Sequence, residues 1–179
     1  LFGWHTSLAP GGSRYGLPWP DILSHVRAAS PPKGKADFHL CRSHNTRKRV
    51  NKLVQRQKGK GEENRIDGKG PLGQPMWIQR GTRLICCLEQ SKYGLFNSQL
   101  LTVASFNDTT VSVECLATGA EHCLSHQWIA ERTRLGWCFT IASSQGQTLR
   151  GSVALWDVSH PRYSLRHLFT SLSRGQEFS

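Results

Sequence analysis

The sequence predicts an α/β fold in which a small parallel sheet is interrupted by an inserted group of antiparallel strands. Two patterns lead to this prediction. Strand-like apolar runs at 37–41, 137–141 and 152–157 alternate with helix-like or turn segments, as they do where parallel strands are joined by crossovers. Between the first two runs, residues 78–128 contain short strand-like stretches separated by turn residues, a pattern typical of a small β-barrel or a curled sheet.

The first strand and helix are predicted at residues 37–57. Asp37 to Cys41 is a short apolar alternation, and residues 43–45 (Ser-His-Asn) are suitable caps for a helix that runs through Gln57. The apolar residues of this helix fall at helical spacing and are expected to face the core: Val50, Leu53 and Val54. Its basic residues are expected on the other faces: Arg47, Lys48, Arg49, Lys52 and Arg56. Residues 59–75 are polar and glycine-rich, so we expect a mobile loop there.

The remaining elements follow from the same two periodicities. Four strands are predicted in the inserted part, at 83–88, 99–104, 110–116 and 121–128. A buried strand is predicted next at 137–141, followed at 144–149 by a turn that opens toward a short helix. Another strand is predicted at 152–157 and a final helix at 164–172. These elements divide the chain into four parts. A lead-in segment at 1–36 is followed by the first part of the α/β domain with its basic loop at 37–77. The inserted β-unit occupies 78–130, and the rest of the α/β domain occupies 131–179.

The charge of the chain predicts a polyanionic partner. The formal net charge is +11, and most of the excess lies between Lys33 and Lys69. A solvated helix face followed by a flexible loop is the alternative explanation of such a charge run.

The cysteines do not predict a disulfide framework. Six are present, and the adjacent Cys86 and Cys87 lie in a strand-like run whose neighbouring side chains point to opposite faces. A zinc site made of Cys115, Cys123 and His126 is an alternative, but no second close pair completes the usual spacing, so buried reduced thiols are preferred and no metal is predicted.

The chain is expected to work inside the cell, without a choice between nucleus, nucleoid and organelle. No run approaches the length of a membrane span, and the first twenty residues are broken by glycines and prolines, unlike a secretory signal. The chain begins with Leu1 and its one methionine is Met76, so we expect it to be a piece of a longer protein.

The most informative stretch is Thr140-Ile-Ala-Ser-Ser-Gln-Gly-Gln-Thr148, directly after a predicted strand. The flexible backbone of Gly146 allows close approach to a ligand, and Gln145 can both donate and accept hydrogen bonds. The hydroxyls of this stretch can donate to phosphate oxygens, and we expect Thr140, Ser143, Ser144 and Thr148 to contact nucleic acid. A polar turn with a glycine cap is the alternative.

That stretch resembles motif V of superfamily-1 DNA helicases of the RecD-like and UvrD-like kind. About twenty-five residues later, Leu168-Phe-Thr-Ser-Leu-Ser-Arg174-Gly-Gln resembles motif VI, which ends in the arginine finger of these helicases. A planar, permanently charged guanidinium suits that role because it can neutralise the charge that develops on a γ-phosphate. The alternative for Arg174 is an exposed arginine that stabilises the end of a helix.

Two weaker stretches agree with the same family. His39 to Asn45, followed by Val50-Asn51, resembles the motif IV region, which implies that Arg42 and Asn45 approach the nucleotide. Residues 79–99 resemble the start of the small SH3-like insertion. Over 37–176 the resemblance therefore implies the second RecA-like domain of a helicase, as a parallel sheet fragment interrupted by a small SH3-like β-barrel.

The departures from the family pattern are equally informative. Ala142 and Ser143 stand where the family commonly has histidine and often a basic residue. The chain contains no Gly-x-x-x-x-Gly-Lys-Ser/Thr loop and no acidic magnesium motif. The resemblance therefore implies that ATP and Mg²⁺ are held mainly by a preceding RecA-like domain of the same protein, and that this chain alone does not hydrolyse ATP.

Single-stranded DNA is the expected partner, with RNA left open and no membrane. Trp77 and Tyr93 flank turns and can stack on unpaired bases, although most aromatic side chains are expected to pack in the core. Lys48, Arg49 and Lys52 are expected to contact phosphates. Two other functions remain open: a non-enzymatic basic nucleic-acid module, which includes a decayed helicase remnant, and an OB-like or ribosomal-type barrel with a basic tail.

Overall fold

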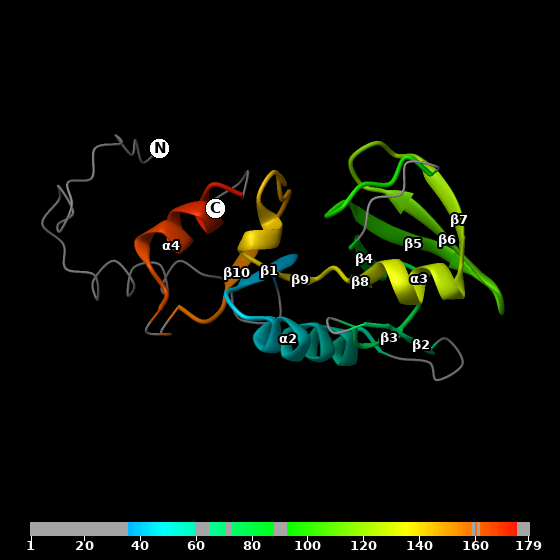
Figure 1. Cartoon of the computed structure of the whole chain (residues 1–179), viewed down its shortest axis with the longest axis horizontal. Coiled ribbons are helices and arrows are strands. Elements are labelled where there is room, and N and C mark those ends of the chain that lie inside the picture. The colour runs from blue at the N-terminus through cyan, green and yellow to red at the C-terminus, as the bar shows by residue number, and fades with distance from the viewer. Residues whose placement is uncertain are drawn as a thin grey trace, which may run out of the picture.

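The computed structural model of the chain describes residues 36–59, 65–70, 73–87, 93–158, 160 and 162–174. The predicted lead-in segment lies outside these residues except for Ala36. The described part contains a three-stranded parallel sheet and a five-stranded antiparallel sheet, which lie side by side above the helix α2 (Figure 1). This is the predicted α/β fold with an inserted β-unit.

The parallel sheet has β1 (Phe38–Cys41) at its centre, between β10 (Val153–Leu155) and β9 (Cys138–Thr140). Side chains alternate across the central strand, so that its two faces contribute to two different hydrophobic clusters. The cluster that contains Cys41 includes residues of α2 (His44–Gln57), and the cluster that contains Leu40 includes Leu168 of α4 (Leu165–Leu172). The two helices therefore cover opposite faces of the sheet, as predicted for a parallel arrangement.

Helix α2 begins as predicted and buries Val50 and Val54 as predicted, but two of its residues differ from the prediction. The Ser43 side chain caps it by accepting a hydrogen bond from the Thr46 amide at 3.1 Å. Arg47, expected on an outer face, is fully buried, whereas Leu53 is 39% exposed. Arg47 shares the buried side of the helix with Val50 and Val54 because the three lie at i, i+3 and i+7. Burial and the nearby positive charge of Arg134 both lower the pKa of Arg47.

The predicted loop at 59–75 contains a strand, so this part of the prediction was wrong. β2 (Arg65–Asp67) pairs antiparallel with β3 (Pro75–Trp77). Ile66 and Met76 lie opposite each other in the register, and both are buried. Each strand contributes one fully inward side chain, which is too short an alternation to predict a strand.

The inserted part is an antiparallel sheet in the order β7-β6-β5-β4-β8. Its strands are β4 (Arg83–Cys86), β5 (Leu100–Phe106), β6 (Thr110–Cys115), β7 (Glu121–Ser125) and β8 (Thr133–Leu135). The predicted strand at 121–128 ends three residues early, because Ser125 caps the short helix α3 (His126–Arg132) by accepting from the Trp128 amide. Helix α3 buries Ile129 and Ala130, which the strand pattern had not anticipated.

The chain passes from the antiparallel sheet back to the parallel sheet at residues 135–138, a tight connection between β8 and β9 that we call the crossing. Gly136 is needed there, since a Cβ atom would lie 2.9 Å from the Leu84 backbone. The fully buried side chain of Asn51 donates to the carbonyls of Leu135 (3.2 Å) and Cys138 (2.9 Å) and accepts from the Cys138 amide (2.9 Å). One hydrophobic cluster runs from Cys41 through this crossing into the inserted sheet, so the two sheets share a core.

The segment after β9 differs from the prediction in one respect. A short 3-10 helix, η3 (Ala142–Ser144), comes first, and the chain then reaches β10 without the expected helix. Gly146 and Gly151 both adopt positive φ, 80° and 117°, which prevents a regular helix between them.

None of the helices in the described ranges is long and apolar enough to cross a membrane.

Candidate functional site

Three segments that carry the predicted functional residues meet at one edge of the parallel sheet. Because β1, β9 and β10 run parallel, their carboxyl ends lie at the same edge. Arg42 and Ser43 follow β1, residues 141–149 follow β9, and Asp157 lies two residues after β10. We call this the motif edge, and Figure 1 shows it where α2 begins and η3 lies above β1.

Asp157 holds the first of these segments, a role that sequence reasoning missed. Its Oδ2 accepts hydrogen bonds from the amides of Arg42 (3.1 Å) and Ser43 (3.3 Å), and its Oδ1 accepts from the Thr46 hydroxyl (2.8 Å). The carboxylate thereby lies at the N-terminus of α2, where a negative charge is favourable. Asp157 has a φ of 62°, in the left-handed backbone region that few residues other than glycine adopt. This backbone conformation directs its side chain toward the N-terminus of α2.

The predicted nucleotide-sensing residues of this segment differ in exposure. Asn45 is exposed in the first turn of α2, while Arg42 is half-buried. The Arg42 Nε atom is buried and makes no hydrogen bond within the described part of the chain, so it retains a donor for an anionic ligand. Arg42 therefore remains a candidate for binding an anionic group, and its predicted contact with a nucleotide stays a prediction.

The hydroxyls after β9 are largely used within their own turn. The Thr140 and Ser143 hydroxyls lie 2.9 Å apart, and the Ser143 amide donates to the Thr140 hydroxyl at 3.3 Å. The Ser144 side chain is fully buried and donates to the Ile141 carbonyl at 2.8 Å. A phosphate contact through Ser144 would require this bond to break, whereas Thr148 is exposed.

The Gln145-Gly146 pair forms an exposed turn. Gly146 has a φ of 80°, and nothing lies within 4 Å of the place where a Cβ atom would be. Glycine is therefore required here by the backbone angle, and the open space beside it leaves the backbone accessible. Gln145 is exposed, so both ends of its amide can reach a ligand.

Gln147 ties this turn to the inserted sheet, and sequence reasoning did not select it. Its Nε2 donates to the Ser98 carbonyl. Ser98 itself has a positive φ of 71°, in the turn before β5. The contact joins residues 49 positions apart, so no local pattern predicts it.

Arg174 lies against the same turn. Its carbonyl accepts a hydrogen bond from the Leu149 amide at 2.8 Å, which places the end of α4 beside residues 145–149. Its Nε donates to the Thr170 carbonyl at 3.4 Å, and the half-buried guanidinium forms no ion pair with any carboxylate that the structure describes. The backbone of Arg174 thus lies beside the segment that follows the Gln145 turn, and the present side-chain contact matches an arginine that stabilises a helix end. A common cleft for the Gln145 and Arg174 side chains stays a prediction. Gly175 and Gln176 lie outside the described residues.

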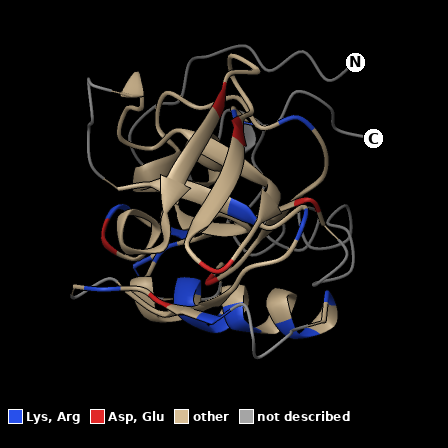
Figure 2. Ribbon diagram, turned by 90° about the vertical axis from the view of Figure 1, so that its right-hand side faces the viewer, with Lys and Arg blue, Asp and Glu red and all other residues tan. Residues whose placement is uncertain are grey.

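The predicted nucleic-acid residues lie in different surroundings. Arg49 and Lys52 are exposed on α2, and Lys48 is half-buried there. Basic residues lie along much of this helix, seen at the lower edge of Figure 2. Half-buried Trp77 lines a pocket next to Lys52, whereas the exposed Tyr93 packs edge-on against Trp128 in the inserted part, with ring centres 6.2 Å apart.

The alternative zinc ligands do not form a metal site in the part of the chain that is described. Cys115 is buried, Cys123 is exposed, and no group of three or more potential ligands is present there. All six cysteines are free thiols, and Cys41 and Cys138 lie 3.7 Å apart between neighbouring strands. Burial, followed by the contact with Cys41, raises the pKa of Cys138.

Comparisons with solved structures identify helicases of the same fold. No protein-family model and no curated protein sequence matches the chain. Pif1 from Bacteroides bound to single-stranded DNA matches with a TM-score of 0.58 at 19% identity, over 92% of this chain and 46% of that one. The Bacteroides protein with ADP-AlF3 and single-stranded DNA gives 0.61 at 18% identity, over 92% and 47%. Pif1 helicase from Candida albicans gives 0.57 at 17% identity, over 89% and 48%.

These similarities establish the fold. The chain spans a little under half the length of the matched helicases. The chain has the fold of the matched part of these Pif1 helicases, a RecA-like parallel sheet fragment interrupted by a small β-unit, and the matches do not single out RecD-like or UvrD-like helicases. The roles of the individual residues remain predictions.

Proposed function

We propose that the chain is the C-terminal motor half of an ATP-dependent DNA helicase that works inside the cell. In this proposal the motif edge closes on ATP and Mg²⁺ held mainly by a preceding RecA-like domain of the same protein. The observation that supports the proposal is the hydrogen bond from the Leu149 amide to the Arg174 carbonyl, which joins the residues after α4 to the segment that follows the Gln145 turn, in a fold similar to that of a helicase. RecD-like or UvrD-like membership remains part of the proposal.

Each residue of the motif edge has a distinct part in the proposed function. Arg174 would release the Thr170 carbonyl and turn its guanidinium toward the terminal phosphate. Gln145, together with Gly146, Arg42 and Asn45, would sense whether that phosphate is present, since amide and guanidinium groups can change partners. ATP supplies the free energy that alternates the closed and open states, and the two states must differ in their affinity for the strand.

The strand would be held by the predicted nucleic-acid residues. The hydroxyl residues after β9 would contact the nucleic-acid strand first: Thr140, Ser143, Ser144 and Thr148. The basic and aromatic residues of α2 and of the strands that follow it would extend this contact: Lys48, Arg49, Lys52, Trp77 and Tyr93. Single-stranded DNA is the proposed ligand. A neutral hydroxyl contact positions a strand, while the lysines and arginines supply the affinity that depends on salt.

The decisive experiment uses the complete protein. Its sequence before Leu1 should contain a Gly-x-x-x-x-Gly-Lys-Ser/Thr loop, and Arg174→Ala should lower its ATP turnover about a thousandfold or more without loss of folding. Arg166→Ala, an exposed arginine of the helix α4 that precedes Arg174, is the matched control and should leave turnover unchanged. A complete protein without a phosphate-binding loop, or one unaffected by Arg174→Ala, would contradict the proposal. So would ATP turnover by this chain alone that single-stranded DNA stimulates.

A second candidate, a basic nucleic-acid module without ATP chemistry, is supported by the net charge of +11. It predicts the same binding of single strands by counterion release but no effect of ATP on affinity in the complete protein. Measuring strand affinity with and without ATP therefore separates the two candidates.

A further inference from the structure

The C-terminal half of α2 has a tryptophan on each side. On one side, Trp77 of β3 lines a pocket of about 180 Å³ with Lys52, Gln55 and Arg56. On the other side, Trp156 lines a wider hollow of about 410 Å³ with residues of the same helix, among them Arg49, Lys52 and Arg56. The two hollows share Lys52 and Arg56, so these cations lie between the two aromatic rings. We call this surface, made of Arg49, Lys52, Gln55, Arg56, Trp77 and Trp156, the tryptophan face.

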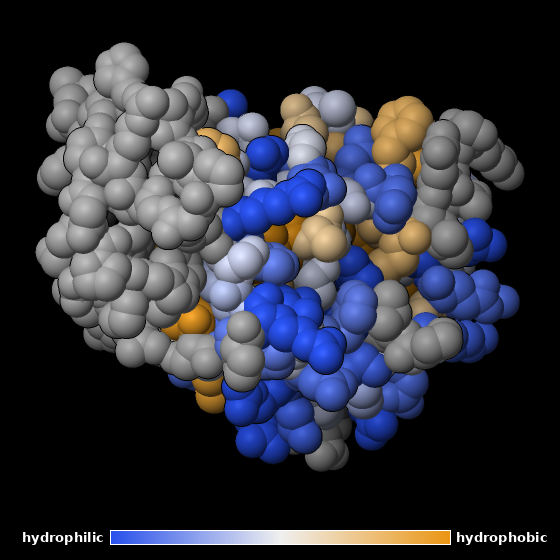
Figure 3. All heavy atoms as spheres, turned by 60° about the vertical axis from the view of Figure 1, so that its left-hand side comes forward, coloured by the Kyte–Doolittle hydropathy of each residue, from blue (hydrophilic) through white to orange (hydrophobic). Residues whose placement is uncertain are grey.

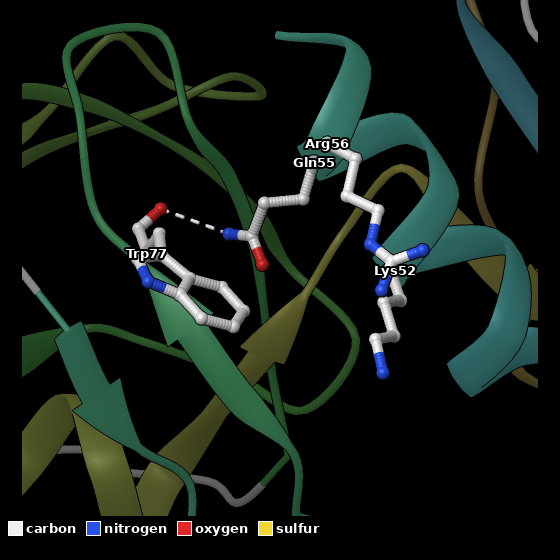
Figure 4. Close-up of a pocket in the computed structure, with 4 residues that line it drawn as sticks. All are labelled: Lys52, Gln55, Arg56 and Trp77. Carbon is white, nitrogen blue, oxygen red and sulfur yellow. Dashed lines mark hydrogen bonds between the residues drawn. The ribbon is translucent and has the colours of Figure 1, made fainter. Parts of the chain in front are cut away.

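Gln55 provides a buried acceptor in the smaller pocket. Its side chain is 2% exposed, and its Nε2 donates to the Trp77 carbonyl at 2.9 Å. Because that carbonyl can only accept, the amide orientation is fixed and Oε1 points the other way. Oε1 is buried and accepts no hydrogen bond within the described residues. Figure 4 shows it between the indole ring and the side chains of Lys52 and Arg56. A buried acceptor of this kind calls for a ligand with an N–H or O–H group.

The two indole rings are held in place by the fold. The Trp77 backbone is tied to α2 through the Gln55 bond to its carbonyl, and the Arg65 guanidinium lies over its ring, 5.9 Å from the ring centre. The Trp156 Nε1 donates to the Nδ1 of His39 at 3.1 Å, so the indole is anchored to the central strand. His39 can accept this bond because burial lowers its pKa to about 4, which keeps the imidazole neutral at ordinary pH. Rings that are already ordered lose little entropy when a flat ligand stacks on them.

The charge of this face is positive along its whole length. Helix α2 contains no acidic residue, and Arg49, Lys52 and Arg56 follow one another at helical spacing on its exposed side. Figure 3 shows hydrophilic side chains over the lower part of the molecule, where α2 runs. No ion pair within the described residues neutralises these three side chains. The positive charge therefore favours an anionic ligand, and the two indole rings favour one that also carries flat groups which can stack on them.

We propose that the tryptophan face is an accessory binding site for an unpaired nucleic-acid strand. One base stacks on Trp77 and donates an N–H from its edge to the Gln55 Oε1, the neighbouring phosphates lie on Lys52 and Arg56, and the next base packs against Trp156. Unpaired bases are needed because stacked and paired bases in a duplex expose neither their faces nor their Watson–Crick edges. The inference rests on the proposed binding of single strands and adds a site to it.

The Trp77 end of this site lies away from the motif edge. Helix α2 starts at the motif edge and is fourteen residues long, so its C-terminal half lies roughly 10–20 Å away along the helix axis. The other end is nearer, since Trp156 directly precedes Asp157 in the chain. An acidic peptide could satisfy the cations but would leave the ring faces and the buried acceptor unused.

The test compares two strands of equal length and charge. One is a fluorescently labelled strand of sixteen thymidines (dT16), and the other carries sixteen abasic sugars. The full 179-residue chain should bind dT16 about tenfold more tightly in fluorescence anisotropy, because each base that stacks contributes to affinity. Trp77→Leu, and separately Trp156→Leu, should remove most of this preference. Lys52→Ala and Arg56→Ala should weaken both strands alike.

Controls keep the result interpretable. Trp77→Phe retains a flat ring and should keep most of the preference, which separates lost stacking from misfolding. Arg166→Ala removes an exposed charge on α4, on the opposite face of the sheet, and should have little effect. Thr148→Ala tests the motif edge in the same assay.

The possible failures are distinct. If the wild-type chain binds dT16 and only Thr148→Ala weakens it, the tryptophan face is not a site. The strand-binding roles proposed for Lys52 and Trp77 then fail as well, whereas the proposed motor function stands. If the abasic strand binds as tightly as dT16, or polyglutamate displaces both equally, the face is a general polyanion surface and the inference is overturned. If the wild-type chain binds neither strand, the inference and the proposed binding of single strands both fail.

Discussion

Replacing Asn51 with leucine should strongly destabilise the protein. The Asn51 side chain is fully buried and makes three hydrogen bonds to the crossing between β8 and β9. Leucine has the same branching and the same number of side-chain heavy atoms, so the change removes the hydrogen bonds without opening a cavity. It leaves the Cys138 amide without this acceptor and the carbonyls of Leu135 and Cys138 without this donor.

The magnitude follows from these three groups. A buried donor or acceptor that loses its partner costs about 1–3 kcal/mol. The expected loss for Asn51→Leu is therefore about 3–5 kcal/mol, less than the simple sum because the crossing can relax. That is a large share of the roughly 5–15 kcal/mol by which a domain is normally stable. In a chain of 179 residues, a loss of about 3 kcal/mol corresponds to a melting temperature about 6–12 °C lower.

Urea unfolding measured by tryptophan fluorescence suits this test. Trp137 lies within the crossing and is 2% exposed, so its emission reports on the packing around Asn51. Asn45→Ala, at an exposed position of the same helix, should change the free energy of unfolding by no more than about 0.5 kcal/mol. An Asn51→Leu protein within about 1 kcal/mol of wild type would show that the crossing does not depend on this amide.

Two further predictions concern groups that sequence reasoning did not select. Asp157→Ala should lower the free energy of unfolding in urea by about 2–4 kcal/mol, because it removes three hydrogen bonds at the start of α2. Asp157→Asn keeps an acceptor and tolerates a positive φ, so it should cost less than half as much. Equal losses for the two variants would refute this role of the carboxylate. The pKa of His39 is about 4 in the folded protein and about 6.5 in the unfolded chain. Below pH 6.5 only the unfolded chain takes up a proton at this residue, so the free energy of unfolding should fall as the pH drops from 6.5 toward 4. Between these pH values the wild-type protein should lose about 3 kcal/mol more than His39→Gln, and parallel pH profiles would contradict the buried neutral imidazole.

The sequence predicted elements that depend on local signals. The strand and helix at 38–57 were correct because an apolar alternation is followed directly by Ser43, a good helix cap. The turn around Gly146 was correct because a glycine beside polar residues marks a change of backbone direction. The same reasoning missed β2, where Ile66 alone points inward. It also carried the strand at 121–125 through the seven residues of α3, which are too few to show helical periodicity.

The site was less predictable because its contacts are long-range. Gln145 and Arg174 were selected from their motifs, but their neighbours were not. Asp157 caps a helix more than 110 positions away, and Gln147 reaches Ser98 in the inserted sheet. Gln55 gave no sequence signal at all, since a glutamine among basic residues looks like part of a solvated helix face. Its significance depends on the Trp77 carbonyl, which fixes the amide orientation.

Helix α2 connects the features on which the proposals depend. Its N-terminus is tied to the motif edge by Asp157, its middle to the strand crossing by Asn51, and its C-terminal half to Trp77 by Gln55. These bonds lie on successive parts of one rigid helix, so the helix cannot shift against the sheet without breaking buried hydrogen bonds. The motif edge and the tryptophan face should therefore move as one body. In the proposed helicase, a change in the position of a bound strand during an ATP cycle would then come from movement between this body and the proposed preceding domain, rather than from rearrangement of α2.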